Sequence, residues 1–274
     1  MITACITIVA ASEISQATLA PPVRALSSGD GISYLSGFDK CAYPSVSEME
    51  YLFTNSPYYW YGLYIGGDTA TYVAHCTFPS ASWLDSVHAQ GWNFVFIWDG
   101  LQAPNSGNSY TFSSNASTAY SQGQQQATEA YGALLGPEGI SNEAANTVVV
   151  DDLEGYEYSG YPYQSAVTAF ISGWDQQLGL PTAQTYGVYG SSCESNLAAL
   201  ASSNPVPEFI WGASWDGNPS TSALPCVPYG YWVDHQRLKQ YEGQVSPYGI
   251  TVDEDCANGP TSPSGSGGTI GNCG

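Results

Sequence analysis

The segment Asn146-Thr-Val-Val-Val-Asp-Asp-Leu-Glu-Gly-Tyr156 combines a buried-strand pattern with three carboxylates. Consecutive valines are typical of a parallel strand that is buried on both faces. Side chains alternate along a strand and rise roughly 3.3 Å per residue, so we expect Asp152 and Glu154 on one side, about 6.6 Å apart, and Asp151 on the other. Paired carboxylates, one protonated and one ionised, can cleave a glycosidic bond. The alternative is a helix-capping aspartate followed by solvated acids.

The composition limits the function further. The chain has 274 residues, with four Lys and Arg against 24 Asp and Glu, and a formal net charge of −20. This length suits one α/β barrel domain with a complete core. The negative charge would repel nucleic acid and anionic membranes, so we expect no nucleic-acid partner and no membrane insertion. We expect a monomer.

The N-terminal segment and the cysteines indicate export. Residues 2–11 form an apolar run too short to span a bilayer, followed by Glu13 and a candidate cleavage site at Val23-Arg-Ala25. Without Cys5, six cysteines remain, and no CxxC or His-rich pair suggests a metal site. We therefore expect disulfides, a secreted protein and no cofactor. The remaining cysteines are Cys41, Cys76, Cys193, Cys226, Cys256 and Cys273.

Strands and helices are expected to alternate through the first two hundred or so residues. The five expected strands are at 37–43, 58–67, 92–99, 146–152 and 183–190. The five expected helices are at 45–55, 80–90, 116–135, 165–178 and 194–201. Ser45 and Glu48 predict a capping box at the start of the first helix. The alternation predicts parallel βα units.

The pattern then changes. We expect strands at 209–215, 231–241 and 248–255, joined by connections too short for a packed helix. The predicted fold class is α/β, a flattened TIM-like barrel with five βα units followed by three strands on plain loops. We expect a leader over 1–25, the barrel domain over 26–257 and a flexible Gly/Ser/Thr/Pro tail over 258–274.

A set of short motifs follows the expected strands in order. They are Gly37-Phe-Asp-Lys-Cys41, Tyr64-Ile-Gly-Gly67, Gly91-Trp92, Gly100-Leu-Gln-Ala-Pro104, Asp152-Leu-Glu154, Gly187-Val-Tyr-Gly190, His235-Gln-Arg-Leu-Lys-Gln-Tyr241 and Val252-Asp-Glu-Asp255. Over about residues 36–257 the chain resembles the secreted glycoside-hydrolase-like domains of unknown function common in actinobacteria, distant relatives of the family 25 lysozymes. The resemblance implies a flattened barrel with five βα units and three further strands.

The same resemblance implies catalytic residues. The Gly-x-Asp of the first strand falls on Asp39, and the Asp-x-Glu after the fourth strand falls on Asp152 and Glu154, with Glu154 as general acid. Asp152 could act as nucleophile or could orient the N-acetyl group of the substrate. This chain departs from the family pattern at Asn105, where members often carry a cysteine, and at Asp99, where an uncharged residue is expected.

We expect the substrate to be bound by residues from several strands. The candidates are Asp99, Gln102, Tyr64, Trp215, His235, Gln240 and Asp253. Alternatives stay open for some of them. His235 could be a structural residue tied to backbone, and Asp253 with Asp255 could hold a neighbouring loop. Trp211 and Trp215 share a face, and both line the mouth or both belong to the core.

The sequence thus predicts a secreted glycoside hydrolase acting on a β-linked, N-acetylated, peptidoglycan-like polysaccharide. Its partner would be a polysaccharide or a cell-wall glycan. One alternative is a non-catalytic carbohydrate- or cell-wall-binding domain on the same barrel, and another is an extracellular structural domain. The negative charge counts against strong binding to anionic walls.

Overall fold

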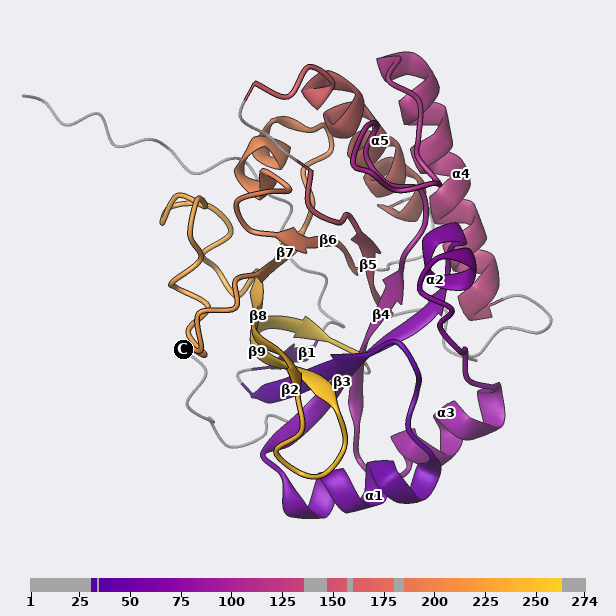
Figure 1. Ribbon diagram of the computed structural model, residues 1–274, viewed down its shortest axis with the longest axis vertical. Coiled ribbons are helices and arrows are strands. Elements are labelled where there is room, and N and C mark those ends of the chain that lie inside the picture. The colour runs from indigo at the N-terminus through magenta and orange to yellow at the C-terminus, as the bar shows by residue number, and fades with distance from the viewer. Residues whose placement is uncertain (1–30, 34, 136–146, 157–159, 180–184, 263–274) are drawn as a thin grey trace, which may run out of the picture.

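Eight strands close into a barrel in the computed structural model, which describes residues 31–33, 35–135, 147–156, 160–179 and 185–262. The strands are β2 (Ser36–Lys40), β3 (Tyr58–Gly66), β4 (Asn93–Trp98), β5 (Val148–Asp152), β6 (Thr185–Ser191), β7 (Phe209–Ala213), β8 (Arg237–Val245) and β9 (Val252–Thr261). They neighbour one another in this order, and β9 also pairs with β2 (Figure 1). Strands β2 to β8 are parallel, and β9 runs antiparallel to both of its neighbours.

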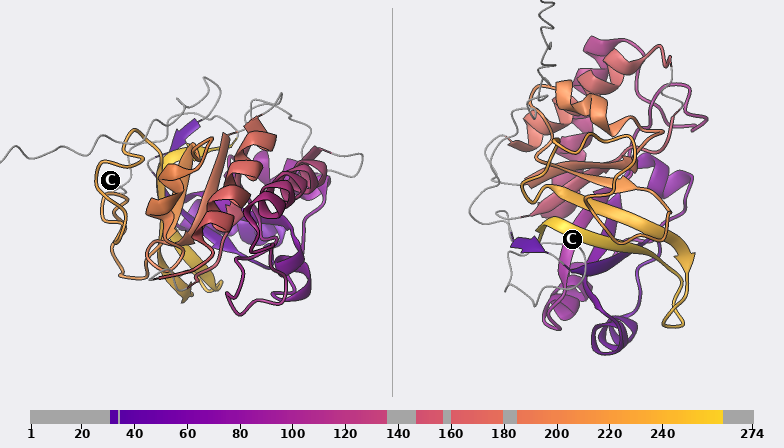
Figure 2. Two further views of the ribbon diagram at one scale, coloured as in Figure 1. Left: turned by 90° about the horizontal axis from the view of Figure 1, so that it is seen from above. Right: turned by 90° about the vertical axis from the view of Figure 1, so that its left-hand side faces the viewer.

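Helices follow the first five barrel strands and lie on the outside of the sheet (Figure 1). They are α1 (Val46–Asn55), α2 (Asp68–Tyr72), α3 (Ala81–His88), α4 (Ala116–Leu135), α5 (Gln164–Gly179) and the short 3₁₀ helix η1 (Leu197–Ser202). In the described part of the chain, no helix connects β7 to β8 or β8 to β9. The right view of Figure 2 shows the hairpin formed by β8 and β9. The predicted fold class is confirmed.

Local sequence signals account for the helix starts. Ser45 caps α1: its hydroxyl accepts from the Glu48 backbone N–H, and the Glu48 side chain accepts from the Ser45 backbone, which is the predicted capping box. Ser80 caps α3 in the same way, with its side chain accepting from the Trp83 backbone. These caps set where each helix leaves the barrel rim.

Several boundaries differ from the sequence prediction. The expected strand over 231–241 begins only at Arg237, because Trp232 and His235 have left-handed φ values of 50° and 58°. Strand β9 continues to Thr261, and the segment expected as a helix over 194–201 is a 3₁₀ helix. Two short elements were not predicted: α2, and β1 (Gly31–Ser33), which pairs with β9.

The barrel interior is filled by large apolar side chains. The buried members are Trp60, Val95, Ile97, Val148, Val150, Phe209, Trp211, Leu238 and Ala257. Glycine is required at Gly62, because a Cβ there would lie 2.6 Å from the Trp211 ring and 2.7 Å from Asp39 Cβ. The interior is therefore a packed core rather than an open channel.

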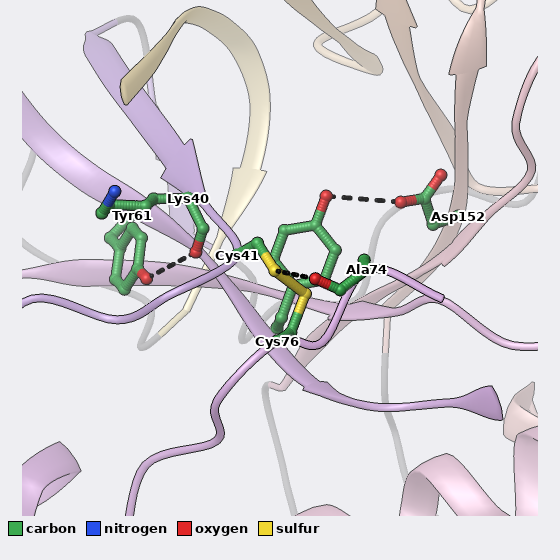
Figure 3. Close-up of a disulfide and its surroundings, with 7 residues drawn as sticks. Lys40, Cys41, Tyr61, Ala74, Cys76 and Asp152 are labelled. Carbon is green, nitrogen blue, oxygen red and sulfur yellow. Dashed lines mark hydrogen bonds between the residues drawn. A yellow bond between two sulfur atoms is a disulfide. The ribbon is translucent and has the colours of Figure 1, made fainter. Parts of the chain in front are cut away.

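Two disulfides join described residues, Cys41 to Cys76 and Cys193 to Cys226, and Cys256 is also disulfide-bonded. Figure 3 shows the first of these beside the end of β2, with Asp152 of β5 in the same view. Cys5, Cys273 and the expected leader lie outside the described residues, as does the expected tail from residue 263. No described helix has the length and apolar character needed to cross a membrane.

Candidate active site

Polar side chains from six strands converge on one end of the barrel. Asp39 lies in β2, Asp99 directly follows β4, Asp152 ends β5, Gln240 lies in β8 and Asp253 in β9. The carboxyl ends of parallel strands meet at the same rim, and the antiparallel β9 brings its N-terminal residues there. Tyr189 of β6 lies at the same rim, and its hydrogen bond to Gln240 is described below.

Asp39 is held by Gln240 across the barrel mouth. The Gln240 Nε2 atom donates to Asp39 Oδ2 at 2.6 Å, and Asp39 lies opposite Asp253 in the strand register. Burial and then the nearby Asp253 carboxylate raise the pKa of Asp39 to about 8, with hydrogen bonds to Gln240 and Asp255 as partial offsets. These effects favour the protonated form of Asp39.

Gln240 also organises the aromatic wall of the mouth. Its Oε1 atom accepts from the Tyr189 hydroxyl at 2.9 Å and from the Trp215 indole N–H at 2.7 Å. Both amide atoms of Gln240 are therefore used, and the side chain is buried. The orientation of Trp215 is coupled to that of Asp39 through this single amide.

Asp152 faces the barrel mouth. Its Oδ2 atom accepts from the Tyr64 hydroxyl at 3.4 Å, the contact drawn as a dashed line to Asp152 in Figure 3. Its buried Oδ1 atom has no hydrogen-bond partner among the described residues. Burial raises the pKa of Asp152 well above its usual range, and the charges of Asp99 and Glu154 act in the same direction. Asp151 lies on the other face of β5, where its charge acts on Asp175 of α5.

Gln102 fixes the ends of β4 and β5 relative to each other. Its Nε2 atom donates to Asp99 Oδ1 at 3.0 Å and to the Asp152 carbonyl at 2.6 Å, and its Oε1 atom accepts from the Glu154 N–H at 2.7 Å. Burial and then the Glu154 charge raise the pKa of Asp99 to about 8, with the Gln102 bond as a partial offset. One amide therefore sets the positions of two candidate acids.

Glu154 lines two cavities at the rim; its side chain is exposed to solvent, and partial desolvation of its carboxyl group raises its pKa. The first cavity has a volume of about 310 Å³, and its walls include Tyr189, Glu194, Trp215 and Gln240. The second has a volume of about 400 Å³, and its walls include Thr69, Asp99, Asn108 and Ser109. An extended ligand that fills both cavities would pass across the Glu154 carboxyl group.

Trp215 follows β7 and presents its ring to solvent, with 63% of its surface exposed. Its ring packs over Gly243, where a Cβ would come within 2.5 Å of the indole. The next residue, Asp216, receives two hydrogen bonds from the buried Lys239 Nζ, at 2.8 and 2.9 Å. These contacts hold the exposed ring at the edge of the first cavity.

The structure brings all but one of the sequence-predicted site residues to this rim. His235 precedes β8 at the opposite end of the barrel, where its Nδ1 atom lies 2.7 Å from Asn258 Oδ1. Trp211 lies inside the barrel and donates to Asp255 Oδ1 at 3.0 Å, so it belongs to the core whereas Trp215 lines the mouth. No group of His, Cys, Asp or Glu side chains in the described part of the chain could hold a metal ion.

Sequence reasoning missed two residues of the first cavity. Tyr189 lies in the quoted motif Gly187-Val-Tyr-Gly190, and strand alternation could have placed it with Asp152, its partner in the β5–β6 register. Glu194 gave no such signal, because a single acid after a strand is common on protein surfaces.

Comparison with known proteins points to one family. The model of the Rv2525c-like, glycoside hydrolase-like domain matches residues 52–257. No curated protein matches the sequence.

Two solved structures with TM-scores above 0.5 show the same fold, and a third is also similar. An uncharacterized protein from B. stearothermophilus is 17% identical with a TM-score of 0.53, over 81% of this chain and 95% of that one. The Tat-secreted protein Rv2525c from Mycobacterium tuberculosis, in complex with L-tartrate, is 15% identical with a TM-score of 0.51, over 82% and 96%. A family 25 glycosyl hydrolase from Bacillus anthracis is 12% identical with a TM-score of 0.46, over 86% and 95%.

Proposed function

Because the chain belongs to the Rv2525c-like glycoside hydrolase-like domain family, we propose that it is a glycoside hydrolase that cleaves a β-linked polysaccharide, with Glu154 as the general acid. The observation that supports this most strongly is the position of Glu154 between two cavities. A glycan spanning both would place a glycosidic oxygen over the carboxyl group. The substrate class expected from the sequence is an N-acetylated, peptidoglycan-like glycan.

The proposed chemistry depends on a retained proton. The Glu154 side chain is exposed at the rim, and partial desolvation of its carboxyl group raises its pKa, which favours the protonated form that can donate to the leaving oxygen. The bond between the anomeric carbon and that oxygen breaks, and water supplies a hydroxyl to the carbon. The second proton of that water replaces the proton that Glu154 lost.

Asp152 would act on the positive charge that develops at the anomeric carbon. In one version its carboxylate stabilises that charge or attacks the carbon; in the other it orients the substrate's acetamide, which then attacks. Tyr64 donates to Asp152, which suits either role, since a hydrogen bond to a carboxylate favours its ionised form. Asp39 and Gln240 would position the neighbouring sugar, and we assign Asp39 no proton transfer.

A non-catalytic carbohydrate-binding domain is the second candidate, and the burial of Asp152 favours it. Only 1% of the Asp152 surface is exposed, and its pKa is raised. A neutral carboxyl group cannot stabilise a cation as a carboxylate does. In this candidate the exposed Trp215 and the two cavities would bind sugars without turnover.

We also propose export, with residues 1–25 as leader, the barrel domain over 26–257 and a tail over 258–274. Disulfides are typical of chains that fold outside the reducing cytoplasm, and the fold relative Rv2525c is Tat-secreted. We propose that the barrel works as a monomer.

The test is the release of reducing ends from peptidoglycan and a panel of neutral and amino glycans, between about pH 3 and pH 7. Wild type is compared with Glu154→Gln and with Glu242→Gln, a matched change at an exposed glutamate of β8. The hydrolase proposal predicts activity in wild type and Glu242→Gln, and its loss in Glu154→Gln. Equal background in all three would contradict it, and sedimentation with insoluble glycan would then support the binding domain.

A further inference from the structure

The charged residues that line the two cavities beside Glu154 are all acidic. The carboxyl groups are those of Glu154 and Glu194 in the first cavity, and of Glu154 and Asp99 in the second. Neither wall includes a lysine or arginine among its described residues. A ligand carrying carboxylates or phosphates would therefore be repelled from both cavities.

The described cations are engaged elsewhere. Lys40 Nζ donates to the Thr251 carbonyl at 3.0 Å, and Lys239 pairs with Asp216. Arg237 donates to a set of backbone carbonyls, including those of Pro228 and Tyr231. The fourth cation of the sequence, Arg24, lies outside the described residues. Lys40 acts electrostatically on Asp253 at the rim, but no described lysine or arginine lines either of the two cavities.

Glu194 is fixed at the wall of the first cavity through its backbone. Its N–H donates to Ser191 Oγ at 3.2 Å, and its carbonyl accepts from the Tyr156 N–H at 3.1 Å. The adjacent Cys193 is tied to Cys226 by a disulfide. The Glu194 carboxylate lies close to Gly155, where a Cβ would be 2.9 Å from Oε2, so it stands beside the residue that follows Glu154.

This inference rests on the proposed hydrolysis but departs from the N-acetylated substrate class expected from the sequence: we propose that the site selects a glycan with free amino groups, and that Glu194 is a specificity-determining residue for it. A glucosamine-type ring would stack on the exposed face of Trp215, and its ammonium group would donate to the carboxylate of Glu194. An ammonium has three donors and no acceptor, so an acid-lined wall satisfies it, whereas an acetamide brings no compensating charge.

Two further observations favour a cationic ligand. Asp152 Oδ1 is buried at the mouth and has no hydrogen-bond partner among the described residues. Burial and the charge of Glu154 raise the pKa of Asp99, and burial and the charges of Asp99 and Glu154 raise the pKa of Asp152. A cation at this rim would relieve the repulsion, because opposite charge stabilises carboxylates.

The test is isothermal titration calorimetry with three probes: a β-1,4-linked glucosamine hexasaccharide, its fully N-acetylated counterpart and a galacturonic acid hexasaccharide. It is run at about pH 6, where the amino groups of the glucosamine probe are charged. The proteins are wild type, Glu194→Gln and Asp234→Asn, the last a matched change at an exposed acid near the opposite end of the barrel. Melting curves confirm that each variant is folded.

We expect wild type and Asp234→Asn to bind the glucosamine probe about tenfold more tightly than the N-acetylated probe, and the galacturonic acid probe most weakly. In Glu194→Gln the ratio should fall by about threefold to fivefold. In about 0.5 M NaCl the preference should shrink in every protein, because salt screens exposed charges.

The outcomes separate this inference from the proposed hydrolysis. Equal affinity for the amino and N-acetylated probes, or a ratio that Glu194→Gln leaves unchanged, overturns the inference even if the protein cleaves glycans. A Glu194-dependent preference without release of reducing ends supports the inference and contradicts hydrolysis. Absence of binding to all three probes overturns the inference.

Discussion

Gln240 donates a hydrogen bond of 2.6 Å to Asp39, a residue 201 positions earlier in the chain. The bond joins β8 to β2 across the mouth, and β9 lies between these two strands in the sheet. The same amide accepts from Tyr189 and Trp215, so one side chain couples a buried acid to the exposed ring at the cavity edge. The polar side chains of the mouth therefore form a connected network, and a substitution at Gln240 should also affect Trp215 at the rim.

Gln240→Ala should lower both stability and glycan affinity. The substitution leaves the Asp39 carboxyl, the Tyr189 hydroxyl and the Trp215 N–H without their described partner, and each buried unsatisfied group costs about 1–3 kcal/mol. Urea denaturation should show a loss of about 2–4 kcal/mol. Gln236→Ala, at a buried glutamine whose Nε2 donates to Glu208 away from the mouth, serves as control for glycan affinity. If Gln240→Ala binds glycan as tightly as wild type, the hydrogen bonds of Gln240 do not position the residues that bind the glycan.

Gly243→Ala should displace Trp215 without unfolding the barrel. A Cβ at this position would lie 2.5 Å from the indole, and the exposed ring is free to turn away. The variant should then resemble Trp215→Ala, with glycan affinity reduced about fivefold to tenfold through loss of stacking. Gly217→Ala would place its Cβ in open space, but it is not a suitable control because Gly217 has a left-handed φ of 67°. Gly132→Ala, on α4 with nothing near its Cβ, is the control. Normal affinity in Gly243→Ala would argue against Trp215 as a sugar platform.

Stability should fall as the pH rises from acid to neutral. Asp175 of α5 is buried beside Asp151 and Glu208, and its carboxyl oxygens have no hydrogen-bond partner among the described residues. Burial first, and then the charges of Glu208 and Asp151, raise the pKa of Asp175 well above its usual range. The folded state thus keeps a proton that the unfolded chain releases above about pH 4. The stabilisation is complete below that pH and is lost progressively as the pH rises toward the folded-state pKa.

Asp175→Asn removes this ionisation and should flatten the pH profile. We expect the free energy of unfolding to fall less between about pH 4 and pH 8 than in wild type, by about 1–3 kcal/mol. Asp85→Asn, at an exposed residue of α3, should leave the profile unchanged. Parallel curves for wild type and Asp175→Asn, measured by urea denaturation at several pH values, would contradict the assignment.

Removal of the disulfide between Cys193 and Cys226 should destabilise the fold. The two residues are 33 apart in sequence, and closing a loop of this length restricts the unfolded chain by about 3–4 kcal/mol in the loop-entropy model. The double variant Cys193→Ser with Cys226→Ser should lose about 2–4 kcal/mol in denaturant, measured without reductant. Wild type measured with reductant should lose at least as much free energy of unfolding. An unchanged denaturation midpoint in the double variant would show that the disulfide does not stabilise the fold.

Local patterns were sufficient for much of the fold. The valines of β5, the Ser45–Glu48 capping box and the alternation of strands and helices depend on short-range chemistry, and the structure confirms them. The connections after β7 are too short for packed helices, so the sequence predicted three closing strands, and the structure confirms them. The family resemblance, which depends on motifs in a fixed order, is confirmed by the family model.

Tertiary contacts decided the rest. The aromatic segment before Arg237 looked like a strand, but Arg237 binds the Tyr231 carbonyl and the Trp232 indole donates to the Pro207 carbonyl, which hold a turn instead. The same contacts place His235 away from the mouth. Glu194 could not be singled out, because only folding reveals that it stands next to Gly155.

The central claim is that Glu154 gives a proton to a leaving oxygen, and leaving-group dependence tests it most directly. The rates of wild type and Glu154→Gln are compared on an oligosaccharide with an ordinary sugar leaving group and on its dinitrophenyl glycoside, whose leaving group needs no protonation. The account predicts that Glu154→Gln loses about 10²–10⁴-fold on the first substrate and far less on the second. Equal losses on both substrates, or none on the first, would contradict it.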